Sequence, residues 1–143
     1  MYDRRVNYEM YMSAALSEAR AAVAKGEIAD GAVAVLDEAL VASAHCQVAA
    51  TGDPTAHSVL LVIREAARRL SRADLSGIIV FTTLEPCAMC VGALLQADVD
   101  GVVFALADLR SGATATLAQG RLTVVSGIMQ REAAELRASP AAR

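Results

Sequence analysis

The sequence predicts an α/β protein folded as a three-layer α-β-α sandwich. Short apolar runs of the kind found in buried strands alternate along the chain with segments whose apolar residues recur at helical spacing. Strands that alternate with helices on one sheet give this architecture. The chain has 143 residues and shows no internal repeat, linker or low-complexity tract, so residues 1–143 are expected to form a single domain.

The N-terminal part of the chain is expected to form a helix followed by a β-hairpin. Apolar residues at helical spacing run from Tyr8 to Lys25, and Gly26 is a natural helix end. Residues 31–35 and 40–48 then have the composition of two short strands. Because few residues separate these strands, we expect them to pair as a hairpin.

A second helix is expected to follow a loop. Asp53 can cap this helix and Pro54 fits its first turn. The helix is predicted from about residue 55 to residue 70. Its buried stripe is expected to comprise Val59, Leu60, Ile63, Ala66 and Ala67.

The remaining elements complete the sheet and cover it. Residues 77–83 are an almost unbroken apolar run, which is typical of a strand covered on both faces. Pro86 is expected to open a helix that reaches about Gln96. Further elements are expected over residues 101–105 (a strand), 121–125 (a candidate fifth strand) and 126–137 (a helix capped by Ser126).

Charge and composition bear on the partners of the chain. Its net charge is −3 and its pI is about 5.3, whereas nucleic-acid binders usually present a clustered basic face. The arginines of the helices are interspersed with glutamates, and few aromatic residues are present to stack on bases. The charge argues against a long nucleic-acid footprint, although not against a small loop that enters a pocket, and together these features predict that nucleic acid is not a partner.

The cysteines and the apolar segments bear on the compartment. Two of the three cysteines form one C-x-x-C, which favours a reducing compartment and metal ligation over a disulfide framework. No apolar run approaches the ~20 residues needed to cross a bilayer. The first residues also lack the apolar core of a signal peptide. The sequence thus predicts a cytoplasmic protein without a membrane segment.

Three residues have the types and the spacing of a catalytic zinc site. Cys87 and Cys90 are expected in the first turn of one helix, and His57 in the first turn of another. Two helix N-termini that meet over one edge of a sheet can place an imidazole and two thiolates around a tetrahedral ion. Three protein ligands leave the fourth position for water, so we predict one Zn²⁺ per chain. A redox-active dithiol is the competing interpretation.

The sequence around these ligands resembles the cytidine deaminase-like superfamily. The resemblance lies in residues 53–57 (DPTAH), 63–66 (IREA) and 82–90 (TTLEPCAMC), and it is strongest to bacterial tRNA adenosine, guanine and cytosine deaminases. It implies a five-stranded mixed sheet, a single zinc held by His57, Cys87 and Cys90, and usually a homodimer. It also implies hydrolytic removal of the exocyclic amine of a nucleobase or related heterocycle.

The chain departs from this family at the residue that moves protons. In the family a glutamate has this role, and Val59 stands in its place. Valine has no titratable group, so two functions remain open. One is an active deaminase of a small base or amino-heterocycle with an altered proton shuttle. The other is a catalytically silent zinc protein that acts as a binding protein or as the partner subunit of an active deaminase. An engineered substitution at Val59 is a third possibility.

Four further positions are candidates for the site. Glu85 is the tentative substitute acid or base, with an alternative role of ordering the turn before Cys87. Cys46 takes the place of an asparagine that binds the base in the tRNA-editing relatives, and Gln47 or His45 is a candidate substitute. Asp108 matches a family position near the substrate. The short final helix of mixed charge differs from the long basic helix of those relatives and argues against tRNA as the substrate.

Overall fold

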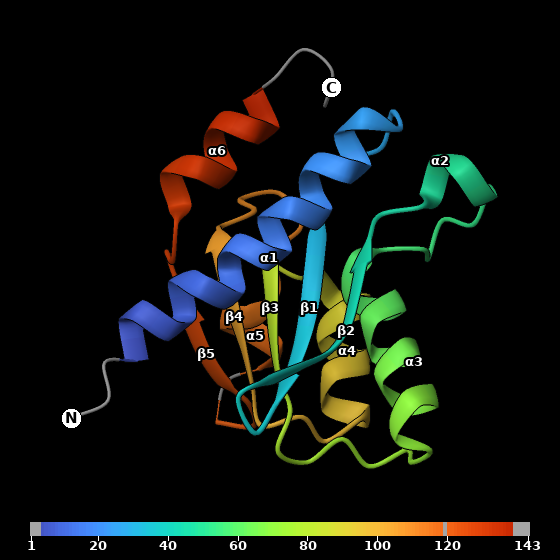
Figure 1. Ribbon diagram of the computed structural model, residues 1–143, viewed down its shortest axis with the longest axis vertical. Helices are drawn as coiled ribbons and strands as arrows, with labels where there is room; N and C mark the ends of the chain where they lie inside the picture. The colour runs from blue at the N-terminus through green and yellow to red at the C-terminus, as the bar shows by residue number, and fades with distance from the viewer. Residues whose placement is uncertain (1–3, 119, 139–143) are drawn as a thin grey trace.

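The computed structural model describes residues 4–118 and 120–138, which form one five-stranded sheet with helices on both faces (Figure 1). The predicted three-layer α-β-α sandwich with a mixed sheet is confirmed. The strands are β1 (Gly31–Leu36), β2 (Ala39–His45), β3 (Ile79–Leu84), β4 (Gly101–Leu106) and β5 (Thr123–Ser126). The helices are α1 (Arg4–Ala24), α2 (Val48–Thr51), α3 (Ser58–Leu70), α4 (Ala88–Gln96), α5 (Thr114–Leu117) and α6 (Gln130–Ala138).

The strands lie in the order β2-β1-β3-β4-β5. Strand β1 is antiparallel to both β2 and β3, whereas β3, β4 and β5 are parallel. The start of β1 therefore lies at the same edge of the sheet as the ends of β2, β3 and β4. The loops that leave this edge carry the candidate site residues.

The two faces of the sheet bury separate cores. In β1 the side chains alternate: Ala32 and Ala34 pack beneath α3 and α4, and Val33 and Val35 pack beneath α1. Phe81 of β3 packs on the α1 face, where α6 also lies. Because both faces are covered, β1 and β3 are buried along most of their length, and for β3 this burial was predicted from its continuous apolar run.

The predicted hairpin is present, with a tighter turn than expected. Asp37 and Glu38 form a two-residue connection, and both have positive φ, at 50° and 66°. Two left-handed residues are what a type I′ turn requires, and its twist matches that of the flanking strands. Strand β2 ends at His45 rather than at Val48, because the chain turns into the short helix α2.

Four predicted helix starts and two predicted caps differ from the structure. Helix α3 begins at Ser58, since Asp53 Oδ1 accepts hydrogen bonds from the amide and hydroxyl of Thr55 and so closes a turn in the loop. Helix α4 begins after Cys87 rather than at Pro86. Ser126 is the last residue of β5 and does not cap α6, which begins at Gln130. Helix α1 begins four residues before Tyr8.

The buried stripe of α3 also differs in part from the prediction. Val59 and Ala66 are buried as expected, and Val62 is fully buried although it was not expected. The other three predicted residues, Leu60, Ile63 and Ala67, are only partly buried. None of the helices described is both long and apolar enough to span a bilayer.

Gly31 sets the closest approach between α1 and the sheet. A Cβ at this position would overlap the carbonyl oxygen of Ala15 and the amide nitrogen of Ala19. We therefore expect Gly31→Ala to lower the free energy of unfolding by about 1–3 kcal/mol or more, because the helix must move away. Urea denaturation measures this change. The control is Gly92→Ala in α4, where a Cβ meets nothing within 4 Å and should stabilise by about 1 kcal/mol. Equal effects at the two positions would contradict the assignment.

Candidate metal centre

His57 and Cys87 occupy equivalent positions at the starts of two helices. His57 is the N-cap residue of α3 and Cys87 is the N-cap residue of α4, both with extended backbone. Neither side chain makes a capping hydrogen bond to its own helix. Helices α3 and α4 pack side by side on one face of the sheet, so their N-termini meet. Both side chains are therefore free to turn toward a common point.

The three predicted ligands lie together with the spacing that zinc requires. His57 Nδ1 is 3.5 Å from Cys87 Sγ and 3.6 Å from Cys90 Sγ. Tetrahedral zinc with Zn–N near 2.0–2.1 Å and Zn–S near 2.3 Å places such donors about 3.6 Å apart. All three ligand atoms lie within 4.8 Å of one another. The donor set and its geometry fit zinc with one position left open.

The electrostatics of the cysteines also fit a cation. Burial, and then the neighbouring Cys87, raise the pKa of the Cys90 thiol far above its ordinary value. A thiolate at this position is costly unless a positive charge lies beside it. A divalent ion supplies this charge, and its binding releases the thiol protons. The positive ends of the α3 and α4 dipoles act in the same direction.

The ligands lie at the base of a pocket of about 280 Å³. This volume is near the small end of the range for ligand pockets and suits a single heterocycle rather than a long ligand. The loop after β4 and the end of α6 also contribute to its lining. Besides the ligands, residues on its walls include Asp30, Cys46, Val59, Leu84, Pro86 and Asp108.

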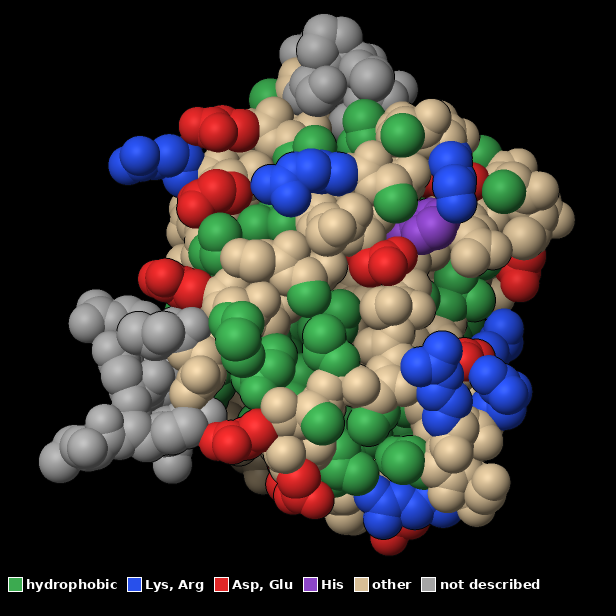
Figure 2. Space-filling model, in the orientation of Figure 1, with side chains coloured by type: hydrophobic (Ala, Val, Ile, Leu, Met, Phe, Trp, Pro, Cys, Tyr) green, Lys and Arg blue, Asp and Glu red, His purple; other side chains and the backbone are tan. Residues whose placement is uncertain are grey.

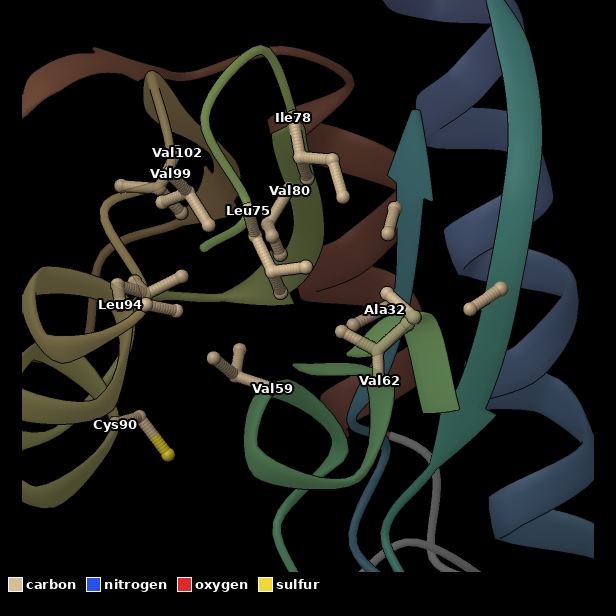
Figure 3. Close-up of a cluster of buried hydrophobic side chains, with 14 residues drawn as sticks. Ala32, Val59, Val62, Leu75, Ile78, Val80, Cys90, Leu94, Val99 and Val102 are labelled. Carbon is tan, nitrogen blue, oxygen red and sulfur yellow. The ribbon is translucent and has the colours of Figure 1, made fainter. Parts of the chain in front are cut away.

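Val59 belongs to the core as much as to the pocket. Its side chain is 2% exposed and points from α3 toward α4, near Cys90 and Leu94 (Figure 3). Val59 therefore forms an apolar wall of the pocket beside the ligands. This wall cannot exchange protons with a substrate.

Glu85 orders the loop after β4. One carboxylate oxygen accepts a hydrogen bond from the Asp108 amide at 3.0 Å. The other accepts from the amide of Thr114 at 3.2 Å and from the Thr114 hydroxyl. Gly112 packs so closely that a Cβ there would overlap the Glu85 carboxylate. These contacts support the ordering role for Glu85 over the alternative of a free acid or base.

The three predicted substrate-binding residues are not all brought together. Cys46 and Asp108 line the pocket, whereas Gln47 lies in a separate groove between β2 and α3 with His45. Asp108 Oδ1 accepts from the amides of Arg110 and Ser111, which shapes the loop at the pocket mouth. Burial raises the pKa of the Cys46 thiol, so this group is a neutral part of the wall.

His45 faces away from the pocket. Its Nδ1 lies 3.0 Å from Glu18 Oε1, and its Nε2 lies 3.4 Å from Lys25 Nζ. Both partners are on α1 or at its end. The structure thus places His45 in a contact between the hairpin and α1, as a residue of the fold.

Sequence reasoning missed Asp30, a carboxylate in the pocket wall. Its Oδ2 accepts a hydrogen bond from the Ser58 amide at 3.1 Å, and so supplies the cap that His57 does not give to α3. Burial raises the pKa of Asp30, and the hydrogen bond from Ser58 opposes this shift. The fully buried Ser58 hydroxyl is close enough to affect the pKa of Asp30, but completes no hydrogen bond of good geometry. The sequence did contain a signal that could have identified Asp30, because this acidic residue directly precedes the apolar run that forms β1.

Glu27 was missed as well. It is only 4% exposed, and its two oxygens accept from the amides of Ala49 and Ala50 at 2.9 and 2.7 Å. These bonds fix the start of α2 to the loop between α1 and β1, in which Glu27 lies. The α2 segment follows Cys46, so Glu27 fixes one wall of the pocket.

Comparison with known proteins agrees with this centre. Residues 5–106 match the family model for the cytidine and deoxycytidylate deaminase zinc-binding region. A tRNA-specific adenosine deaminase from Bacillus subtilis is 37% identical over 132 residues, covering 87% of this chain and 82% of that protein. The tRNA-specific adenosine deaminase of Aquifex aeolicus is 40% identical over 104 residues, covering 73% of this chain and 69% of the relative.

Solved structures show the same likeness. One from a study of A-to-I editing by tRNA:A34 deaminases superposes with a TM-score of 0.85 at 33% identity, covering 89% of this chain and 98% of the other. A guanine deaminase from Bacillus subtilis superposes with a TM-score of 0.66 at 32% identity, covering 80% and 70%.

The prediction that nucleic acid is not a partner was wrong. Proteins named as tRNA-specific adenosine deaminases match most of the chain. The prediction rested on net charge, which sums over the whole surface. An RNA loop that enters a small pocket meets only the charges at its mouth, and net charge does not report on these.

The metal centre predicts a defined response to ligand substitution. We expect the wild-type chain to bind one equivalent of zinc, and His57→Ala and Cys87→Ser to lose most of it, because two ligands alone hold zinc weakly. Metal analysis after dialysis measures the content. Cys46→Ser is the matched control, since this cysteine lies outside the ligand cluster and should keep its zinc. Equal zinc loss in all three variants would contradict the ligand assignment.

Proposed function

This chain belongs to the cytidine and deoxycytidylate deaminase family, and from this premise we propose that it is a zinc-dependent deaminase of adenosine in tRNA. The reaction replaces the exocyclic amine by oxygen, so that adenosine and water give inosine and ammonia. The observation that carries the proposal is the cluster of His57, Cys87 and Cys90, with one open position, at the base of a pocket of the size of one base.

The pocket residues have separate tasks in this reaction. Zinc, when bound, acts as a Lewis acid that activates water as a nucleophile. Val59, Leu84 and Pro86 present apolar surface to the pocket, which limits access of bulk water and can contact the face of a base. Asp108 and the backbone of its loop lie at the mouth, where they can accept and donate hydrogen bonds to polar edges of the base.

The mouth of the pocket also offers positive charge for a phosphate backbone. Arg110, in the loop after β4, and Arg137, near the end of α6, both line the pocket. Both are exposed, and neither forms an ion pair within the described part of the chain. Phosphate contacts of this kind position a nucleic acid without reading its sequence. They support RNA as the substrate more than a free base, which has no phosphate.

Elsewhere the surface charge is mixed. Figure 2 shows acidic and basic side chains interspersed over one face, with a group of basic side chains over α3. In α3, Glu65 accepts from both Arg68 and Arg69, so part of this positive charge is neutralised. We therefore expect a small RNA footprint centred on the pocket, such as one loop, rather than a long groove.

Two other functions give different results in the same assay. The likeness to a guanine deaminase suggests a free base as substrate. Val59, where the family has glutamate, suggests a silent protein that binds without turnover. Arg110 and Arg137 at the pocket mouth favour RNA over a free base, and the intact three-ligand cluster favours turnover over silent binding.

Activity on tRNA is the direct test of the proposal. We expect the zinc-loaded chain to convert adenosine to inosine in a tRNA with adenosine at the wobble position, and not in the same tRNA with guanosine there. Nucleoside analysis of digested tRNA measures inosine, and ammonia release is followed with free adenine, guanine and cytosine. Turnover of a free base with none on tRNA would contradict the substrate. No turnover by wild type together with turnover by Val59→Glu would support the silent protein instead.

The arginines at the mouth predict a specific effect on RNA binding. We expect Arg137→Gln to weaken tRNA binding and to lower the slope of log K against log [salt] by about 1, because one phosphate contact is lost. Filter binding at several salt concentrations measures both. Arg131→Gln is the matched control, because Arg131 is exposed on the same helix and does not line the pocket. The same salt slope for both variants would argue against a phosphate at the mouth.

A further inference from the structure

Deamination by water needs a group that moves protons. The attacking water must lose two protons, while a ring nitrogen and the departing amine must each gain one. General acid–base assistance of this kind typically contributes about 10²- to 10⁴-fold in rate. Val59 cannot provide it, so an active site requires a carboxylate or another titratable group from a different element.

Within residues 4–118 and 120–138, the carboxylates that line the pocket are Asp30, Glu85 and Asp108. Both oxygens of Glu85 are engaged by donors of the loop that it orders. Asp108 lies in that loop, where Oδ1 holds two backbone amides. Asp30 differs from both, because it orders no loop: its carboxylate accepts from the Ser58 amide at Oδ2, and the hydroxyls of Ser58 and Thr82 lie close enough to lower its pKa.

Asp30 also contacts the helix turn that carries both a ligand and Val59. Its partner Ser58 is the residue between His57 and Val59 at the start of α3. Asp30 is near enough to His57 and Cys90 to interact electrostatically with both. The carboxylate thus lines the pocket from the residue directly before β1, beside the helix turn that carries Val59.

The backbone around Asp30 is firmly held. Its amide donates to the Ile28 carbonyl at 2.7 Å, and its carbonyl accepts from the Cys46 amide at 2.9 Å. The next residue, Gly31, is fixed by its close contact with α1. A side chain on such an element keeps its position, as proton transfer in a defined geometry requires.

We propose that Asp30 is the catalytic carboxylate of this protein and performs the proton transfers for which Val59 has no group. Asp30 accepts each water proton in turn and passes one to the ring nitrogen beside the reacting carbon and one to the amine. The water oxygen bonds to that carbon, and the carbon–amine bond breaks. Ammonia leaves with the electron pair of that bond, the carbonyl forms and the carboxylate is restored. This inference rests on the proposed deaminase chemistry, with either tRNA or a free base as substrate.

The decisive variant is Asp30→Asn. The amide oxygen of asparagine can still accept from Ser58, so the cap of α3 is kept while the proton-accepting group is lost. At saturating zinc we expect kcat to fall by about 10²- to 10⁴-fold. Zinc content, melting temperature and the Kd for tRNA are expected to match the wild type. Asp37→Asn, in the exposed hairpin turn, is the matched control and should retain full activity.

A second variant tests the exchange of roles between the two positions. We expect Asp30→Asn combined with Val59→Glu to regain turnover, because the added glutamate restores a carboxylate beside the ligands. Glu85→Gln and Asp108→Asn are assayed in parallel, each with its melting temperature.

The outcomes separate this inference from the proposed function. A kcat of Asp30→Asn within about threefold of wild type would overturn the role of Asp30. A fall in kcat that is accounted for by lower zinc content or by a lower melting temperature would overturn it as well. Loss of activity confined to a well-folded Glu85→Gln or Asp108→Asn would assign the proton transfers to that residue and would also overturn the role of Asp30.

A wild-type chain that deaminates a free base but not tRNA refutes the proposed substrate and leaves the Asp30 result valid. A wild type that is inactive on every substrate overturns both.

Discussion

The site depends on the packing of α3 against α4 with their N-termini at the same edge of the sheet. Each helix places a metal ligand, His57 or Cys87, at its N-cap position, where residues usually turn a side-chain oxygen back to the helix amides. Here neither side chain does so, and both point to a shared centre with Cys90. The Ser58 amide instead donates to Asp30, which directly precedes β1 and is distant in sequence. The same local arrangement therefore places His57 in the ligand cluster and supplies the start of α3 with a different cap, Asp30.

The walls of the pocket are held by two carboxylates that accept hydrogen bonds from backbone amides. Glu27 fixes the start of α2, and Glu85 fixes the loop between β4 and α5. A carboxylate that accepts several amide hydrogen bonds can hold a loop without any regular secondary structure. Short loops at this edge therefore keep a defined shape, which a pocket for one base requires.

In this protein the residues that form the fold and the ligand cluster are distinct from the residue that we propose for proton transfer. The chain matches the deaminase family and carries the ligand cluster, while Val59, which lines the pocket beside the ligands, belongs to the apolar core. A pocket has several walls, and a carboxylate from any of them can reach the same substrate atom if the geometry allows. The loss of one catalytic side chain at a given sequence position is therefore weak evidence for loss of activity. Overall charge is similarly weak evidence against RNA, because only the charges at the mouth meet the ligand.

The sequence by itself determined the alternating elements, the five strands and the ligand set. Apolar periodicity and the local H…P-C-x-x-C spacing carry this information within short segments. The sequence analysis misplaced the starts of α3 and α4. A helix start depends on which hydrogen-bond acceptors are available to the first backbone amides of the helix, and these acceptors come from other parts of the chain. The sequence analysis also could not separate Glu85, which holds a loop, from Asp30, which faces the pocket. Only the tertiary structure decided this, because strand order brings the start of β1 beside α3, and no local pattern encodes which partners a carboxylate meets.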